Sequence, residues 1–191
     1  MPNHTIQTRA HIRSEISSIK PLDEVEHKHQ ADALAWLDSG AGLFRLAKPA
    51  TPPKHLVSYF VVVDEGHILL VDHKNARLWL PPGGHVEPDE DPRQTVLREL
   101  EEELGFKAAH AIEAPLMITA TTTVGITAGH TDVSLWYVVR ASRYQPIKFD
   151  KQEFNAVRWF AFSEAPLETS DPHLGRFMAK LGFCAAQAPA K

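Results

Sequence analysis

Four glutamates occupy five consecutive positions of one segment: Glu99, Glu101, Glu102 and Glu103. Like charges three and four residues apart destabilise a helix, so such a cluster is most easily kept when a cation lies among the carboxylates. Carboxylate oxygens are the preferred ligands of hard divalent ions such as Mg²⁺. The spacing therefore predicts a metal site built on one turn of a helix.

The phase of that helix separates the four glutamates. At about 100° per residue, Glu99, Glu102 and Glu103 fall within a sector of roughly 100°. The opposite side carries an apolar stripe that faces the core, formed by Leu97, Leu100 and Leu104. Glu101 falls near the edge of this stripe. We therefore expect three glutamates to share a cation and Glu101 not to take part.

Capping residues delimit the same helix. Asp91 is a suitable N-cap, and Pro92 fits the first helical turn. Gly105 suits the left-handed position that ends many helices. The sequence thus predicts a helix from about Pro92 to Leu104. Within it, Arg98 lies four residues before Glu102, where the two side chains can pair and brace the acidic face.

The whole segment from Gly84 to Phe106 resembles the Nudix box of the Nudix hydrolases, G-x5-E-x7-R-E-U-x-E-E-x-G-U, where U is a bulky apolar residue. Every fixed position is filled, by Gly84, Glu90, Arg98, Glu99, Leu100, Glu102, Glu103, Gly105 and Phe106. With typical residue usage, a chance match is on the order of 10⁻⁹ per starting position. A solvated surface helix rich in glutamate would explain neither the glycines nor Arg98.

The resemblance implies an activity: Mg²⁺- or Mn²⁺-dependent hydrolysis of a phosphoanhydride bond in a nucleoside diphosphate linked to another group. By the family pattern, Glu99 and Glu103 are the surest metal ligands. Glu102 is a third ligand or shares the role of general base. Glu90 and Arg98 are expected to hold the loop and the helix in place.

A fourth carboxylate is expected from outside the box. In similar family members an acidic residue reaches the site from the loop before the last strands. Glu153 has that position here, six residues before Trp159, and Asp150 is its near competitor. An exposed loop acid is an equally good interpretation of either residue.

Substrate-binding residues are predicted with less support from the pattern. Gly83 and Gly84 allow the backbone to approach the metal site closely. Lys74 and Arg77 are candidates for contact with phosphates, although each also fits a solvated surface charge. His85 is expected to flank the site without binding metal. Residues 129–132 are interpreted as a turn before a strand that faces the cleft.

The chain is expected to divide at a proline-rich connector, residues 49–54. Residues 1–48 are predicted to form a helical extension with a helix near residues 23–38. We expect Trp36 and Leu37 to be buried against the main domain or a second subunit. The Nudix hydrolase domain is assigned to residues 55–181 and a C-terminal tail to residues 182–191.

Strand patterns fill most of the assigned domain. They cover residues 56–64, 67–72, 78–80, 116–124, 132–140 and 156–162, and a short helix is expected over 173–181. The segment 81–84 is expected to break regular structure. Strands before and after a helix favour an α/β sandwich, and the resemblance implies a mixed sheet between helices, an α/β/α Nudix-type fold with the N-terminal helical extension added.

The composition argues against several classes of protein: nucleic-acid binding, disulfide-bonded, membrane-spanning and secreted. The net charge is −4 without a basic block, which argues against a nucleic-acid polymer as partner. Cys184 is the only cysteine, so no intrachain disulfide can form. No apolar run approaches a membrane span, and the first residues lack the apolar core of a signal peptide. We therefore expect a cytoplasmic protein that acts on a small nucleotide-type substrate, with a homodimer as one possible assembly.

Two other functions are compatible with the fold that the resemblance implies. A non-catalytic Nudix-fold ligand sensor would be expected to lose some metal glutamates, whereas all are present here. An isomerase of isoprenyl diphosphates would require a catalytic cysteine before or near the box, whereas Cys184 lies far downstream. Hydrolysis remains the leading interpretation.

Overall fold

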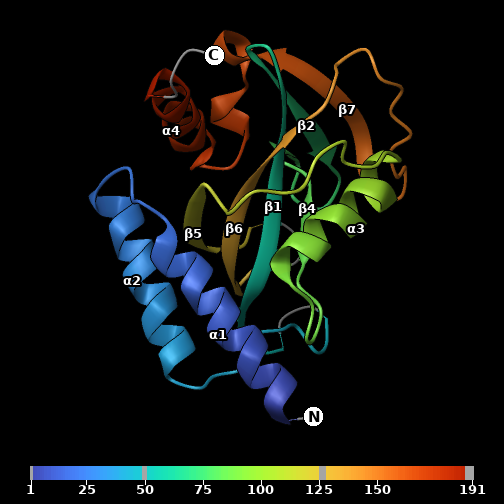
Figure 1. Ribbon diagram of the computed structural model, residues 1–191. Helices are drawn as coiled ribbons and strands as arrows, with labels where there is room; N and C mark the ends of the chain where they lie inside the picture. Colours follow the sequence, from blue (N-terminus) through green and yellow to red (C-terminus); the bar gives the residue numbers. More distant parts are fainter. Residues whose placement is uncertain (1, 49–50, 125–127, 188–191) are drawn as a thin grey trace.

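The computed structural model describes residues 2–48, 51–124 and 128–187, with side chains from residue 7 to residue 182. The thiol of Cys184 lies outside this range. The described chain forms an α/β sandwich around one mixed sheet of seven strands, as predicted (Figure 1). The strands are β1 (Lys54–Asp64), β2 (His67–His73), β3 (Leu78–Leu80), β4 (Gly83–His85), β5 (Met117–Thr122), β6 (Thr131–Arg140) and β7 (Phe154–Ala161).

Strand β1 is the centre of the sheet. It pairs in parallel with β6 along one edge, whereas β2 and β4 pair antiparallel with different parts of its other edge. The sheet continues from β2 to β3 and β7, and from β6 to β5. The long β1–β6 ladder joins segments that are about 75 residues apart in the sequence, and it brings the start of β6 beside the start of β1.

The segment that was expected to break regular structure instead contains the short strand β4. Gly83 pairs with Tyr59 and Gly84 with Ser58. A Cβ atom at Gly83 would lie 2.4 Å from the carbonyl oxygen of Ser58 and 2.9 Å from Tyr59 Cα, so only glycine fits this approach. The prediction failed because glycine usually weakens a strand, whereas here its lack of a side chain permits the pairing.

Alternating side chains of the strands build one core on each face of the sheet. Leu56, Phe60 and Val62 of β1 pack with the residues of α3 (Pro92–Leu104) and of the N-terminal helices. Val61 and Val63 face the other way, toward Leu174 and Phe177 of α4 (Leu174–Gln187). The helices therefore lie on both faces, and α4 is several residues longer than the predicted closing helix.

The N-terminal residues form two helices that lie side by side, α1 (Pro2–Ser18) and α2 (Glu24–Asp38) (Figure 1). Asp23 caps α2, because its carboxylate accepts hydrogen bonds from the N–H groups of residues 25 and 26. Trp36 and Leu37 are buried, and they belong to the same core as the sheet. The extension is thus packed onto the domain, and α1 is an addition to the single helix expected near residues 23–38.

Helix α3 begins and ends as its sequence predicts. The Asp91 carboxylate accepts a hydrogen bond from the N–H of Arg93, and Gly105 adopts φ = +72° at the C-terminal end. Its N-terminal half is also held by α1, through the ion pair between Arg93 and the buried Glu15. Among the described residues, no helix is long and apolar enough to cross a membrane.

Candidate functional site

A cavity of about 700 Å³ lies where α3, β1, β4 and the start of β6 meet. This volume is typical of pockets for small-molecule ligands. The lining includes side chains of two groups, one acidic and one rich in histidine. The acidic group consists of Glu99, Glu103 and Glu153; the histidine group consists of His55, His85, His130 and Asp132, of which all but His55 line the cavity.

Glu103 is the most enclosed member of the acidic group, with only 5% of its surface exposed. Its Oε2 accepts a hydrogen bond from the N–H of Gly83 at 3.0 Å. Burial, together with the nearby charges of Glu99 and Glu153, raises the pKa of Glu103 well above its ordinary value. The helix and the β4 backbone therefore hold a carboxylate in a place where its negative charge is poorly neutralised.

Glu99 lies one helical turn before Glu103 and also lines the cavity. Burial raises the pKa of Glu99, and the adjacent Arg98 opposes this rise. Gly84 makes room for the carboxylate, because a Cβ atom at Gly84 would lie 1.8 Å from Glu99 Oε1. A larger residue at this position would displace the glutamate.

Glu153 comes from the segment before β7, and the fold brings it to the same cavity. The carbonyl of Glu153 accepts a hydrogen bond from the N–H of Lys74, which ties this segment to the end of β2. Asp150, its competitor in the sequence interpretation, is not part of the cavity lining. Its carboxylate accepts a hydrogen bond from the N–H of Gln152.

Arg98 connects the acidic group to the loop before α3. Its Nε and one terminal nitrogen contact the two oxygens of Glu90 at 3.1 and 3.2 Å, and Nη1 contacts Glu99 Oε1 at 2.7 Å. Thr95 donates a further hydrogen bond to Glu90. The hydrogen bond to Glu90 is the main reason that the pKa of Arg98 is raised. This network braces the loop against the helix.

The remaining glutamates of the cluster point elsewhere. Glu102 has 61% of its side chain exposed, lies 3.3 Å from Arg98 Nη1 and does not line the cavity. Glu101 is exposed and lies 3.6 Å from Lys107 Nζ. The helical phase thus places Glu101 apart from Glu99 and Glu103, as predicted, but Glu102, which was expected to share the cation, also lies outside the cavity lining.

The predicted phosphate-binding side chains also lie outside the cavity lining. Lys74 donates a hydrogen bond to the carbonyl of Lys151, and Arg77 is exposed. Two basic residues that the sequence interpretation did not select, Arg45 and Lys48, line the cavity instead. Burial lowers the pKa of Arg45, while the negative charges of Asp132, Glu99 and Glu153 oppose that change. Arg45 therefore faces the acids across the cavity.

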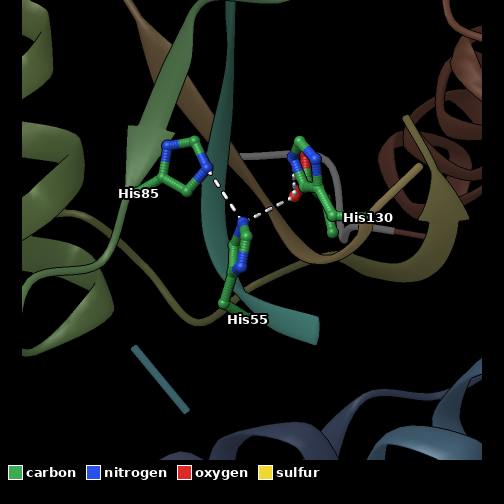
Figure 2. A group of neighbouring side chains, drawn as sticks. His55, His85 and His130 are labelled. Carbon is green, nitrogen blue, oxygen red and sulfur yellow. Dashed lines mark hydrogen bonds and ion pairs between the residues drawn. The ribbon is translucent and has the colours of Figure 1, made fainter. Parts of the chain in front are cut away.

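The second group was also missed by the sequence interpretation. His85 Nε2 lies 3.1 Å from His55 Nε2, which in turn lies 3.1 Å from Asp132 Oδ1. His130 Nε2 lies 3.4 Å from the same oxygen. Figure 2 shows His85 and His130 on either side of His55. Burial and the nearby Arg45 lower the pKa of His85 to about 3, so its ring is neutral at ordinary pH.

The acidic group suits a hard divalent cation. Burial raises the pKa of Glu103 and Glu99, and neighbouring carboxylates add to the rise, so negative charge in this group is costly. Their oxygens are less tightly gathered than those of two other groups. Among the described residues, candidate ligand atoms lie within 4.8 Å of one another only in the histidine group and in His11, Glu15 and Asp91.

Comparisons with known proteins identify relatives of this chain. The chain is 42% identical over 53 residues to the putative 8-oxo-dGTP diphosphatase of Bacillus subtilis, which covers 27% of this chain and 36% of that protein. It is 30% identical over 93 residues to the probable DHNTP pyrophosphohydrolase of Lactococcus lactis, which covers 49% and 55%. The chain thus spans about a third to a half of the length of these curated relatives.

A solved structure extends the likeness to the fold. The MutT NUDIX hydrolase of Burkholderia pseudomallei is similar with a TM-score of 0.51 and 27% identity, over 59% of this chain and 87% of that one. The family model of the NUDIX domain matches residues 53–181, which contain the sheet, α3 and the cavity-lining glutamates. The chain therefore belongs to the NUDIX family.

Proposed function

We propose that this protein is a divalent-metal-dependent pyrophosphohydrolase, which cleaves a phosphoanhydride bond in a nucleoside diphosphate linked to another group. The observation that carries the proposal is the meeting of Glu99, Glu103 and Glu153 in one cavity. Two of these residues come from one helix and the third from a distant loop. A cation would neutralise the negative charge that they share, which burial makes costly.

The names of the curated relatives support the same reaction class. One is described as a putative diphosphatase of 8-oxo-dGTP and the other as a probable pyrophosphohydrolase of DHNTP. Both names describe cleavage of a diphosphate bond. An (oxidised) nucleoside triphosphate is accordingly our first candidate substrate, and ADP-ribose-like compounds are the second.

Glu99, Glu103 and Glu153 would hold Mg²⁺ or Mn²⁺, which neutralises phosphate charge and lowers the pKa of a bound water when present. The backbone N–H of Gly83 and the guanidinium of Arg98 orient two of these carboxylates. A carboxylate beside the ion would accept the proton of the attacking water. Glu153 would do so if Glu99 and Glu103 held the ion without it; otherwise Glu102, which lies outside the cavity lining, is the candidate.

The substrate's own charge is met by other residues. Arg45 and Lys48 line the cavity and are placed to contact phosphate oxygens. Lys74 and Arg77 would reach a substrate only if it extended beyond the lining. A cytoplasmic location and a homodimer remain predictions from the sequence.

A substrate panel with Mg²⁺ tests the proposal. The panel contains nucleoside triphosphates, an 8-oxo-purine triphosphate, ADP-ribose and a dinucleoside polyphosphate, and each reaction is scored for phosphate, diphosphate and nucleoside monophosphate. We expect at least one to yield a nucleoside monophosphate, at a rate that falls at least a hundredfold in Glu103→Gln. Tight binding of a nucleotide without any turnover would instead support the sensor alternative.

A further inference from the structure

The pairing of the strands places four candidate ligand residues on one face of the sheet. His55 of β1 is the direct partner of Asp132 in β6, and Val57 is the partner of His85 in β4. Side chains of paired residues share a face, and so do residues two apart along a strand. His55, His85 and Asp132 must therefore project to the same side, where His130, two residues before Asp132, joins them (Figure 2).

The distances within this group match a four-coordinate ion. A tetrahedral metal bound at about 2.0–2.1 Å separates its ligand atoms by about 3.3 Å. The observed separations are 3.1 Å between His85 Nε2 and His55 Nε2, 3.1 Å between His55 Nε2 and Asp132 Oδ1, and 3.4 Å between His130 Nε2 and Asp132 Oδ1. All four ligand atoms lie within 4.8 Å of one another.

The hydrogen bonds on the far sides of two rings set their protonation. His55 Nδ1 lies 2.8 Å from the carbonyl oxygen of Pro52. A carbonyl oxygen only accepts, so Nδ1 carries the proton, and a neutral His55 has its lone pair on Nε2. This is the arrangement in which a metal-binding histidine is usually held, with its other nitrogen bonded to a backbone carbonyl.

His130 follows the same pattern. Its Nδ1 lies 3.1 Å from the hydroxyl oxygen of Thr123, and that hydroxyl donates to the carbonyl of His130 itself. Nδ1 is therefore the donor, and Nε2 of a neutral His130 presents a lone pair toward Asp132. Asp132 Oδ1 is buried and accepts no hydrogen bond from any described residue. Lone pairs of two rings and a carboxylate thus converge on one point, which an ion would satisfy.

We propose that His55, His85, His130 and Asp132 form a site for Zn²⁺, separate from the acidic group on α3. Three imidazoles and one carboxylate suit Zn²⁺, whereas Mg²⁺ requires oxygen ligands and near-octahedral geometry. Four protein ligands close the tetrahedron, which is the pattern of a structural zinc site. The ion would join β1, β4 and β6, and it would fix the segment Gly83–His85 that approaches Glu99 and Glu103.

A different protonation state of His55 would also reduce the repulsion between the converging lone pairs. A proton on His55 Nε2 would make an imidazolium that pairs with Asp132, and no metal would then bind. The two states differ in a measurable way, because only the first takes up an ion at neutral pH. The proposal does not depend on the hydrolase reaction, since its test needs no substrate.

The test uses the full chain without a histidine tag, freed of metal by a chelator. Zinc content after equilibration and gel filtration is measured by elemental analysis, and Co²⁺ is added to a second sample as a spectroscopic probe. We expect one Zn²⁺ per chain that survives excess Mg²⁺, a visible Co²⁺ spectrum of tetrahedral type, and a rise in Tm of several degrees with zinc.

Variants assign the ion to the histidine group. His85→Ala is the main variant, because His85 is only half-buried and the fold tolerates its removal more readily than that of the enclosed His55. Asp132→Asn keeps the shape of the carboxylate and removes its charge. Both should lose zinc binding at least a hundredfold. Glu103→Gln and His73→Asn alter the same cavity outside the group and should retain the Co²⁺ spectrum.

X-ray absorption on the zinc-loaded wild type keeps the test independent of variant folding, and three imidazoles with one oxygen donor are expected. Three outcomes would overturn the proposal. The first is a wild type that takes up no zinc, as the imidazolium state requires. The second is unchanged binding in folded His85→Ala and Asp132→Asn. The third is loss of the Co²⁺ spectrum in Glu103→Gln, which would assign the ion to the acidic group instead.

Discussion

The acidic group and three members of the histidine group, His85, His130 and Asp132, line the same cavity, but the two groups differ in their electrostatics. Glu99 and Glu103 accumulate negative charge that burial makes costly. The histidine group offers one carboxylate and three imidazoles, among them that of His85, whose pKa burial lowers to about 3. A hard ion suits the first group and a borderline ion the second. The two proposed sites thus differ in ligand type, which would make them select different metals.

The groups also differ in how the chain assembles them. Glu99 and Glu103 are four residues apart on one helix, so a single turn brings them together. His55, His85 and His130 come from three strands, and their meeting depends on the register between those strands. The first arrangement withstands small shifts between elements, whereas the second would be lost if β4 slipped by one residue.

Removal of metal should give the largest difference between the two groups, because one is expected to control turnover and the other Tm. Chelation should abolish turnover, because the charge of the acidic group is then left without a cation beside the substrate phosphates. Mg²⁺ or Mn²⁺ should restore turnover, whereas zinc alone at one equivalent should restore Tm without restoring the rate. Kinetics and thermal unfolding on the same samples give both readouts. Full activity in metal-free buffer would refute the proposed role of the acidic group.

Loss of the Glu103 charge should have the next largest effect. Glu103→Gln keeps the size of the side chain but removes a ligand of the proposed ion, whose charge stabilisation is worth several kcal/mol. We expect kcat at saturating Mg²⁺ to fall at least about a hundredfold, which corresponds to about 2.7 kcal/mol. The Tm should not fall, because a poorly neutralised buried charge disappears. A fall of less than tenfold would contradict this role.

A methyl group at Gly84 should act through Glu99. In Gly84→Ala the new Cβ would lie 1.8 Å from Glu99 Oε1, so the carboxylate must move. Displacement of a positioning group by about 1 Å can cost up to about a hundredfold in rate. We expect a ten- to hundredfold loss of kcat/KM.

The matched control is Gly182→Ala. A Cβ atom at Gly182 of α4 would meet nothing within 4 Å, so turnover should be unchanged and the helix slightly more stable. If the two alanine variants had the same kcat/KM, the clash at Gly84 would have no effect on function.

The smallest effect is expected at Glu101, which belongs to the same cluster in the sequence. Its side chain is exposed and lies near Lys107, away from the cavity. Glu101→Gln should therefore lose less than about tenfold in kcat, or roughly 1.4 kcal/mol. The variant is measured beside Glu103→Gln at saturating Mg²⁺. Equal losses would show that the helical phase does not decide which carboxylates act.

Much of the acidic group could be predicted because its determinants are local. The cap Asp91, the terminal Gly105 and the apolar stripe define α3 without any information from the rest of the fold. The period of 3.6 residues then separates Glu101 from Glu103. Even so, Glu102 shares the predicted sector but is exposed and lies outside the cavity lining.

The sequence by itself determined the helix of the box, the family and the main strands, since each depends on short-range spacing and capping. The tertiary structure alone decided which distant side chains share the cavity: Glu153 and not Asp150, Arg45 and Lys48 and not Lys74 and Arg77. It also assembled the histidine group, whose members lie 30 and 45 residues apart. Strand register carries no signature in a local window of sequence, because it is set by which strands pair and by the glycines that let β4 approach β1.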